Sequence, residues 1–327
     1  MAPIISNDLD KYFSDVDIPD ELRDDIDSLK AWLEKQPHLP KVSDRQLLVF
    51  FNVNQQSTER TKKFLECHYT IRTHAPDFFS NRTVDEFRNI AEYLHLNILA
   101  GKTVEGHKLE VISLKDFTVS KFNLAQCCKY MFAMSDIASH EVLDNNKGWR
   151  ILFDMNGFGL GHFLRFHPAV VKKCILYVQD ALPLQLKGIH IINAIPLVHQ
   201  ILAMVKPIMK KEVYDLIQIH TSSEWESLYK VVPQELLPSD FGGKDQSMDQ
   251  LHGKDNRRKK INRSKLKFSN VNANSGNFAV NTHCFIRNLI MSFFPRPSQK
   301  RRMIVVTILL IMIDRKSSRY SLSVVNS

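Results

Sequence analysis

Apolar residues recur at helical spacing through the first part of the chain. Leu22, Ile26 and Leu29 repeat every three or four positions, which predicts a helix that the prolines of PHLP then end. We expect Asp44 to cap a second helix, and a third helix to occupy residues 58–76. This spacing predicts a small all-α domain at residues 1–95.

Further along, short apolar runs alternate with longer amphipathic segments. Strands are predicted at residues 108–114, 150–155, 188–194 and 217–220, and helices at 123–142, 167–182 and 209–216. Alternation of strand and helix is typical of an α/β fold with a mostly parallel sheet. We therefore expect an α/β domain at residues 96–246 and an atypical tail at 247–327.

The net charge of +9 is concentrated in that tail. From Lys254 onward there are 16 basic and 2 acidic residues, which leaves 28 basic and 33 acidic residues in the rest of the chain. Because the folded part is mildly acidic, the charge does not indicate a nucleic-acid partner. The basic, asparagine-rich tail has the composition of disordered sequence.

Location is inferred from two further patterns. The first residues lack a basic region followed by an apolar run, and the apolar run at 303–313 is too short for a ~30 Å hydrocarbon layer at ~1.5 Å per residue. The five cysteines are irregularly spaced, without a C-x-x-C pair. These features favour reduced thiols and a cytoplasmic protein.

Candidate chemistry was sought in the glycines and histidines. Gly157, Gly159 and Gly161 have G-x-G-x-G spacing, which differs from the dinucleotide fingerprint, so we interpret them as a turn after a strand. The histidines show no zinc or metalloprotease spacing, and no G-x-S-x-G elbow is present. We expect no enzyme activity, no metal and no cofactor; a Rossmann-type enzyme is a weaker alternative.

The strongest feature is an apolar stripe between residues 193 and 214. Lys206, Lys210 and Lys211 flank the stripe, and Pro207 is expected to kink the helix. On pattern alone, the segment is either a core helix or an amphipathic lid over an apolar cavity. The stripe consists of Ile195, Val198, Ile201, Leu202, Val205, Ile208 and Met209.

Residues 182–220, followed by LPSDFGG at 237–243, resemble the lipid-binding domain of the CRAL-TRIO family. The resemblance is to its α-tocopherol transfer and retinaldehyde-binding branch, especially the insect proteins. WLEKQPHLP (residues 32–40) followed by DRQLLVFF (residues 44–51) resembles the helical domain that precedes it there. The resemblance implies a helical domain, then a sheet lined by helices that encloses one hydrophobic ligand, with a mobile helix as gate.

Carried over by position, the resemblance makes the apolar stripe of residues 195–209 the gating helix. It also implies a ligand-binding wall of apolar side chains. The wall residues are Phe153, Leu160, Phe163, Phe166, Val178, Leu182, Leu184, Leu186 and Ile189.

Members of that branch hold a phosphoinositide headgroup in a basic cluster, and this chain departs from the pattern. Gln185, Asp215 and Asn52 occupy positions where basic residues are expected, and only Lys187 keeps the charge. Lys210 and Lys211 are candidates to replace the missing charges.

The resemblance and the residues together predict a cytoplasmic carrier, transiently at membrane surfaces and expected to be a monomer. It would hold one hydrophobic ligand, such as a tocopherol, a retinoid or a phospholipid, and exchange it at membranes. The alternative of a different class is a lipid-sensing recruitment module that uses the same domain without transfer.

Overall fold

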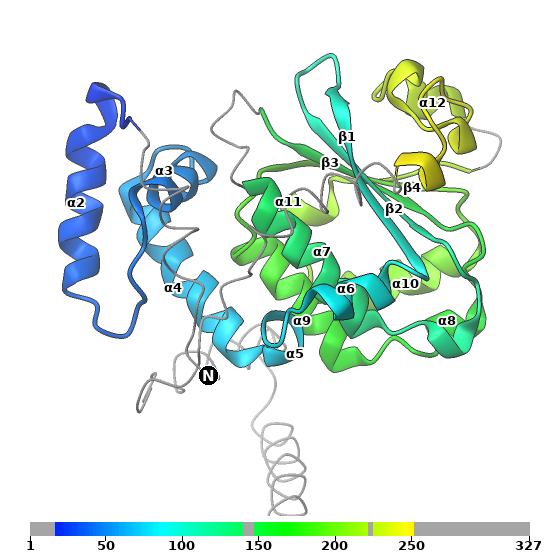
Figure 1. Cartoon of the computed structure of the whole chain (residues 1–327), viewed down its shortest axis with the longest axis horizontal. Helices are drawn as coiled ribbons and strands as arrows, with labels where there is room; N and C mark the ends of the chain where they lie inside the picture. Colours follow the sequence, from blue (N-terminus) through cyan, green and yellow to red (C-terminus); the bar gives the residue numbers. More distant parts are fainter. Residues whose placement is uncertain (1–16, 140–146, 222–224, 252–327) are drawn as a thin grey trace, which may run out of the picture. The chain divides into compact units, whose positions relative to one another are not determined.

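The computed structural model describes residues 17–139, 147–221 and 225–251, and the first part of this is helical (Figure 1). Buried leucines and phenylalanines of α2, α3 and α4 form one apolar cluster, which explains the spacing seen in the sequence. The elements are η1 (Asp20–Leu22), α2 (Arg23–Glu34), α3 (Asp44–Val53), α4 (Thr58–His74), α5 (Pro76–Phe79) and α6 (Val84–Ile90).

Serine side chains cap the first turns of α3 and α4. Ser43 caps α3 in a reciprocal capping box with Gln46, whereas Asp44 is the first helical residue, so the expected cap is displaced by one position. Ser57 caps α4 in the same way, by accepting a hydrogen bond from the Arg60 amide.

The α/β part is built on a five-stranded sheet in the order β1-β2-β3-β4-β5. The strands β2 to β5 are parallel, as predicted, and β1 adds an antiparallel edge that the sequence analysis missed. Both strands of this first pair carry apolar residues on both faces. The strands are β1 (Leu94–Lys102), β2 (Lys108–Leu114), β3 (Trp149–Asp154), β4 (Leu186–Ile192) and β5 (Ile217–Ile219).

Helices cover one face of the sheet and the C-terminal segment covers the other (Figure 1). Leu109, Val111 and Leu152 pack against Phe241 and Met248 on the C-terminal side. The remaining elements are η2 (Val119–Lys121), α7 (Leu124–Ser139), α8 (Leu160–Phe163), α9 (Pro168–Asp180), α10 (Leu197–Val205), α11 (Lys211–Tyr214), α12 (Trp225–Tyr229), η3 (Gln234–Leu236) and η4 (Ser239–Phe241).

Residues 247–251 belong to the folded part, although the sequence analysis placed them in the tail. Met248 is buried in the cluster beneath the sheet, and its amide donates to the Asp240 carboxylate at 2.7 Å. The Asp249 carboxylate accepts from His95 at 3.1 Å. The rest of the predicted tail, from residue 252, lies outside the described residues.

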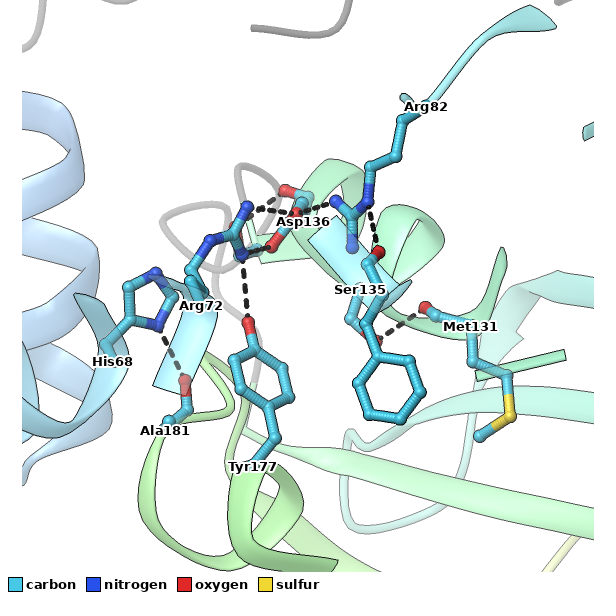
Figure 2. A network of polar contacts seen from close by, with 10 residues as sticks. His68, Arg72, Arg82, Met131, Ser135, Asp136, Tyr177 and Ala181 are labelled. Carbon is cyan, nitrogen blue, oxygen red and sulfur yellow. Dashed lines mark hydrogen bonds and ion pairs between the residues drawn. The ribbon is translucent and has the colours of Figure 1, made fainter. Parts of the chain in front are cut away.

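A buried ion cluster ties α4 to α7 and α9 (Figure 2). The Arg72 guanidinium donates to both carboxylate oxygens of Asp136, at 2.9 and 3.0 Å, and to the Tyr177 hydroxyl at 3.0 Å. Arg82 donates to the same carboxylate at 2.6 Å. Both guanidinium groups also lie over the Phe79 ring, 4.4 and 4.8 Å from its centroid.

The ion pairs with arginine keep the Asp136 carboxyl group ionised despite its burial. Burial acts to raise the pKa of Asp136, but the charges of Arg72 and Arg82 and the hydrogen bond from Arg72 hold it well below its ordinary value. Close by, the His68 Nδ1–H donates to the Ala181 carbonyl at 2.7 Å (Figure 2). Burial, followed by the charge of Arg72, lowers the pKa of His68 to about 3.

Replacing Asp136→Asn is expected to lower the free energy of unfolding by about 3 to 5 kcal/mol, because two buried guanidinium groups lose their counter-charge. Urea denaturation at pH 7 measures the loss. Asp77→Asn is the matched control, since its ion pair with Lys173 is about one-third exposed and should cost less than about 1 kcal/mol. Equal losses in the two variants would show that the buried ion cluster contributes no more to the free energy of unfolding than an exposed ion pair does.

His68 predicts a loss of stability on mild acidification. Its folded pKa of about 3 lies below the value of 6.5 for an unperturbed histidine, so the unfolded chain binds a proton that the folded chain rejects. The free energy of unfolding should therefore fall as pH drops from 6.5 toward 3. The slope from this one group is at most about 1.4 kcal/mol per pH unit.

His68→Gln keeps a donor for the Ala181 carbonyl and should flatten that slope when unfolding is followed by urea titration between pH 7 and 4. A residual slope is expected, because burial lowers the pKa of His190 to about 4. The exposed His167→Gln is the control and should leave the slope unchanged. An unchanged slope in the His68 variant would contradict the assignment.

Candidate functional site

One row of side chains crosses all five strands on the helix-covered face. The register pairs Ile98 with Glu110, Glu110 with Ile151, Ile151 with Ile189, and Ile189 with Ile217. Neighbours in register point to the same face of a sheet, so the row is isoleucine throughout except for one glutamate. Ile98 and Ile151 pack in the cluster with α7, which fixes the face that the row occupies.

Three helices enclose this face. Cys127, Tyr130, Ala133 and Met134 of α7 pack over β1, β2 and β3. We call these residues, together with the strand residues and Tyr93 that they contact, the α7 cluster. The helix α10 packs over β4 and β5 in a second group, the gate–sheet cluster, defined by Met155, Ile191 and Val198. The face between α7 and α10 therefore has apolar side chains on every side.

The helix α9 packs against both α7 and α10. Its residues Val171 and Ile175 pack against Val205 of α10 in the gate–α9 cluster. Its other residues, including Tyr177, pack with Phe132 of α7 and with α4 and α5 in the α4–α9 cluster. Phe79, which stacks on Phe132 at 5.8 Å, also belongs to this contact.

The structure divides the nine expected wall residues into groups. Phe153, Phe166 and Leu186 pack against the α7 cluster, and Ile189 lies in the isoleucine row. The Phe163 ring is partly buried, 5.9 Å from that of Phe166. In contrast, the α4–α9 cluster contains Val178, Leu182, Leu184 and part of Leu186. Leu186 thus belongs to both clusters, while Val178, Leu182 and Leu184 pack in the cluster that includes α4 and α5 of the helical domain.

Leu160 does not fit an enclosed wall. Its side chain is 60% exposed on α8, and Leu164, one turn later, is 74% exposed. The adjacent loop adds Phe117, which is 50% exposed. A Cβ on Gly157 would lie 2.2 Å from the Phe117 ring, so this loop packs directly beside the glycine turn. Gly157 serves the turn itself, since it has a φ of +73°, whereas Gly161 lies within α8.

The predicted gating segment, residues 195–209, is now called the gate segment. Val198 is 2% exposed and packs on the sheet, while Leu202 contacts both the sheet and α9. Ile195 and Ile201 belong to the gate–sheet cluster; Val205, Ile208 and Met209 belong to the gate–α9 cluster. The helix ends at Val205 instead of continuing through a kink, because Pro207 has no amide to donate and clashes with the preceding turn.

Polar contacts bracket the gate segment, and within it the Lys206 ammonium lies 5.4 Å from the centroid of the Tyr214 ring on α11. Before it, the Asn193 side chain donates to the Asp154 carboxylate at 2.8 Å, and Asn193 has a positive φ of 48°. After it, the Lys210 amide donates to Gln179 at 2.9 Å, and its ammonium pairs with Asp180. Within the described part of the chain, no side chain of residues 195–205 forms a hydrogen bond or ion pair with another element.

The positions expected to hold a headgroup are not a free basic cluster. Lys210 pairs with Asp180 and Lys211 with Asp215, so each charge is compensated. Lys187 is exposed at the start of β4 and packs beside Gly148. Gln185 donates to the carbonyl of Asn52 at 2.9 Å, which joins two of the three departing positions across the domain boundary.

Sequence reasoning missed three residues of this face. The rings of Phe122 and Phe158 lie 5.9 Å apart and contact the predicted Phe166, which widens the aromatic part of the site. Phe158 lies between Gly157 and Gly159, and the sequence analysis interpreted only the glycines of this motif. Glu110 could have been found as a lone acidic residue in the apolar strand KLEVISL.

The opposite face of the sheet carries a polar chain. Arg150 donates to the His107 Nδ1 at 3.0 Å and contacts His190 at 3.2 Å, and His190 contacts His220 at 3.1 Å. Among the described residues, no group of three or more potential metal ligands was found. Likewise, no helix in the described ranges is both long and apolar enough to cross a membrane.

Two family models match parts of this chain. Residues 93–243 match the CRAL/TRIO domain, and residues 18–88 match the Pinta-like UBA domain. The crystal structure of Sfh5 aligns with 76% of this chain and all of its own, with a TM-score of 0.46 and 14% identity.

Relatives found by sequence are 25% identical or less over the matched part. The chain is 25% identical over 229 residues to the alpha-tocopherol transfer protein-like protein of Mus musculus and 21% identical over 230 residues to clavesin-1 of Rattus norvegicus. The matched part covers 69% of this chain in both cases, and 66% and 64% of those proteins, just under two thirds of their length. Members of the CRAL-TRIO family bind and transfer lipophilic ligands. The sheet, the helices that cover it and the family match identify residues 93–243 of this chain as a CRAL/TRIO domain.

Proposed function

We propose that the chain is a carrier that holds one small hydrophobic molecule against the helix-covered face of its sheet. The ligand would lie between α7, α9 and the gate segment and would leave when the gate segment lifts at a membrane. The relatives whose name refers to tocopherol transfer support a ligand of that size and polarity. The protein would work in the cytoplasm and visit membranes transiently.

The proposal is supported mainly by the apolar contacts that hold the gate segment to the sheet and to α9. The gate segment is held to the sheet and α9 by apolar contacts, while the opposite side of the site is fixed by the buried Asp136 cluster. Apolar contact is non-directional, so a membrane can replace it with an equivalent apolar phase. The polar contacts at Asn193 and Lys210 limit the moving segment at its two ends.

The membrane contact itself is proposed at the exposed apolar patch formed by Phe117, Leu160 and Leu164. Arg165 lies beside Leu164 and adds a positive charge, which suits an anionic surface, whereas Lys115 and Lys121 pair with Asp249 and Asp116. A phosphoinositide site at Lys210 and Lys211 is less well supported, because Asp180 and Asp215 already neutralise these side chains.

Leu202→Ala is expected to loosen the gate segment. The partly buried side chain contacts both clusters, so its removal should cost about 1 to 2 kcal/mol, less than for a fully buried leucine. Hydrogen exchange of residues 195–209 should then accelerate roughly fivefold to thirtyfold, with the central strands unchanged. Transfer of a nitrobenzoxadiazole-labelled tocopherol between donor and acceptor vesicles should become faster.

His199→Ala, on the exposed side of the same helix, is the matched control and should alter neither measurement. If exchange accelerates across the whole sheet, Leu202 is part of the core and the segment is not a gate. If the native chain binds vesicles but does not speed transfer above the spontaneous rate, the recruitment module is the better assignment.

Leu160→Gln with Leu164→Gln should weaken binding to vesicles that contain anionic phospholipid by roughly tenfold or more, because two apolar side chains are lost from the contact. Vesicle co-sedimentation measures this effect. The thermal midpoint should stay within about 2 °C, since both side chains are exposed. Val104→Gln is the control, as Val104 is 91% exposed in the loop between β1 and β2. Equal losses for the patch and control variants would argue against the patch.

A further inference from the structure

Glu110 is a buried carboxyl group in apolar surroundings. Its residue is 3% exposed, and Oε1 has no hydrogen-bond partner among the residues that the structure describes. A buried polar group without a partner costs about 1 to 3 kcal/mol, and more if it is charged. Leucine or isoleucine would fill the same strand position without that cost, so the carboxyl group requires an explanation.

The register places this carboxyl group on the ligand face. Leu109 and Val111, its neighbours along β2, belong to the cluster on the C-terminal side of the sheet. Ile112, two residues later, belongs to the α7 cluster, and side chains alternate along a strand. Ile98 and Ile151, its partners on the adjacent strands, also pack in the α7 cluster. Glu110 therefore lies beneath α7, in the row that leads to the gate segment.

Its position along that row suits one end of an elongated ligand. Ile217, at the far end of the row, contacts the gate segment. Three strand spacings of ~4.8 Å separate β2 from β5, so Glu110 lies ~14 Å from the gated end. A molecule that enters beneath α10 and lies across the sheet would bring its leading end to this carboxyl group.

We infer that Glu110 is the polar anchor of the ligand site and hydrogen-bonds a single hydroxyl or carbonyl oxygen at the inner end of an otherwise apolar ligand. This inference rests on the proposed carrier function and defines its ligand class. A pure hydrocarbon would leave the carboxyl group unsatisfied, whereas an alcohol, a phenol or an aldehyde would pair with it.

The protonation state of Glu110 agrees with such an uncharged partner. Burial alone raises the pKa of Glu110 to about 8, so the carboxyl group is mostly protonated at neutral pH and can donate as well as accept. The Tyr93 hydroxyl, in the α7 cluster, is already engaged, because it donates to Gln126 at 3.1 Å. Glu110 thus offers hydrogen-bonding capacity that its own cluster leaves unused.

The test compares the full native chain with Glu110→Gln and Glu110→Leu. Binding of 1-hexadecanol, hexadecane and hexadecylamine is measured by displacement of the dye 1-anilinonaphthalene-8-sulfonate. The native chain should prefer the alcohol to the alkane by about tenfold, the worth of one hydrogen bond in an apolar site. Glu110→Gln should keep most of this preference, and Glu110→Leu should lose it while binding the alkane at least as tightly.

A second measurement separates anchoring from loss of folding. Glu110→Leu should have a higher thermal midpoint than the native chain, because it removes an unsatisfied buried group. Glu92→Gln, which changes an exposed carboxylate, should alter neither the midpoint nor the preference.

Two outcomes would overturn the inference. Either Glu110→Leu keeps the alcohol preference of the native chain, or hexadecylamine binds best and Glu110→Gln abolishes that binding, which would make Glu110 a counter-ion. If the native chain binds none of the three probes, the carrier function itself fails, and this result is distinct from the other two.

Discussion

The arrangement of the site depends on the buried ion pairs between the Asp136 carboxylate and two arginines. The carboxylate accepts hydrogen bonds from Arg72 on α4 and from Arg82 before α6, while Arg72 also reaches Tyr177 on α9 (Figure 2). Because buried charges are stable only when paired and hydrogen-bonded, this geometry allows little displacement of α7 relative to α9. The helical domain thus acts as a brace for the two helices that frame the site.

The other side of the site is held in a physically different way. Contacts of Leu202 with the sheet and with α9 have no preferred direction, so the gate segment can move without breaking a buried ion pair. In the proposed carrier, the contacts of Asn193 and Lys210 with side chains on β3 and α9 would confine the motion to the residues between them. A rigid frame opposed to an apolar cover is what a carrier requires, since only one wall has to open.

Most of the sheet and its helices could be predicted from the sequence because apolar periodicity reports burial directly. β2 was predicted at its observed bounds, whereas β1 was missed, since LHLNILAGK contains polar residues at buried positions such as His95 and Asn97. The family resemblance predicted which segment would be the gate. It could not distinguish residues of the ligand-binding wall from residues of the core. Leu182 and Leu184 are apolar like Phe153, and only the packing of α4 and α5 shows that they face another neighbour.

The position of Glu110 could not be predicted for the same reason that makes it informative. Sequence periodicity treats an acidic residue in an apolar strand as an exception, while the register shows that it interrupts a row of isoleucines across five strands. Each isoleucine in that row contributes to stability by burial, and the carboxyl group does the opposite. In the proposed carrier, a ligand oxygen on that face would restore the stability lost at Glu110.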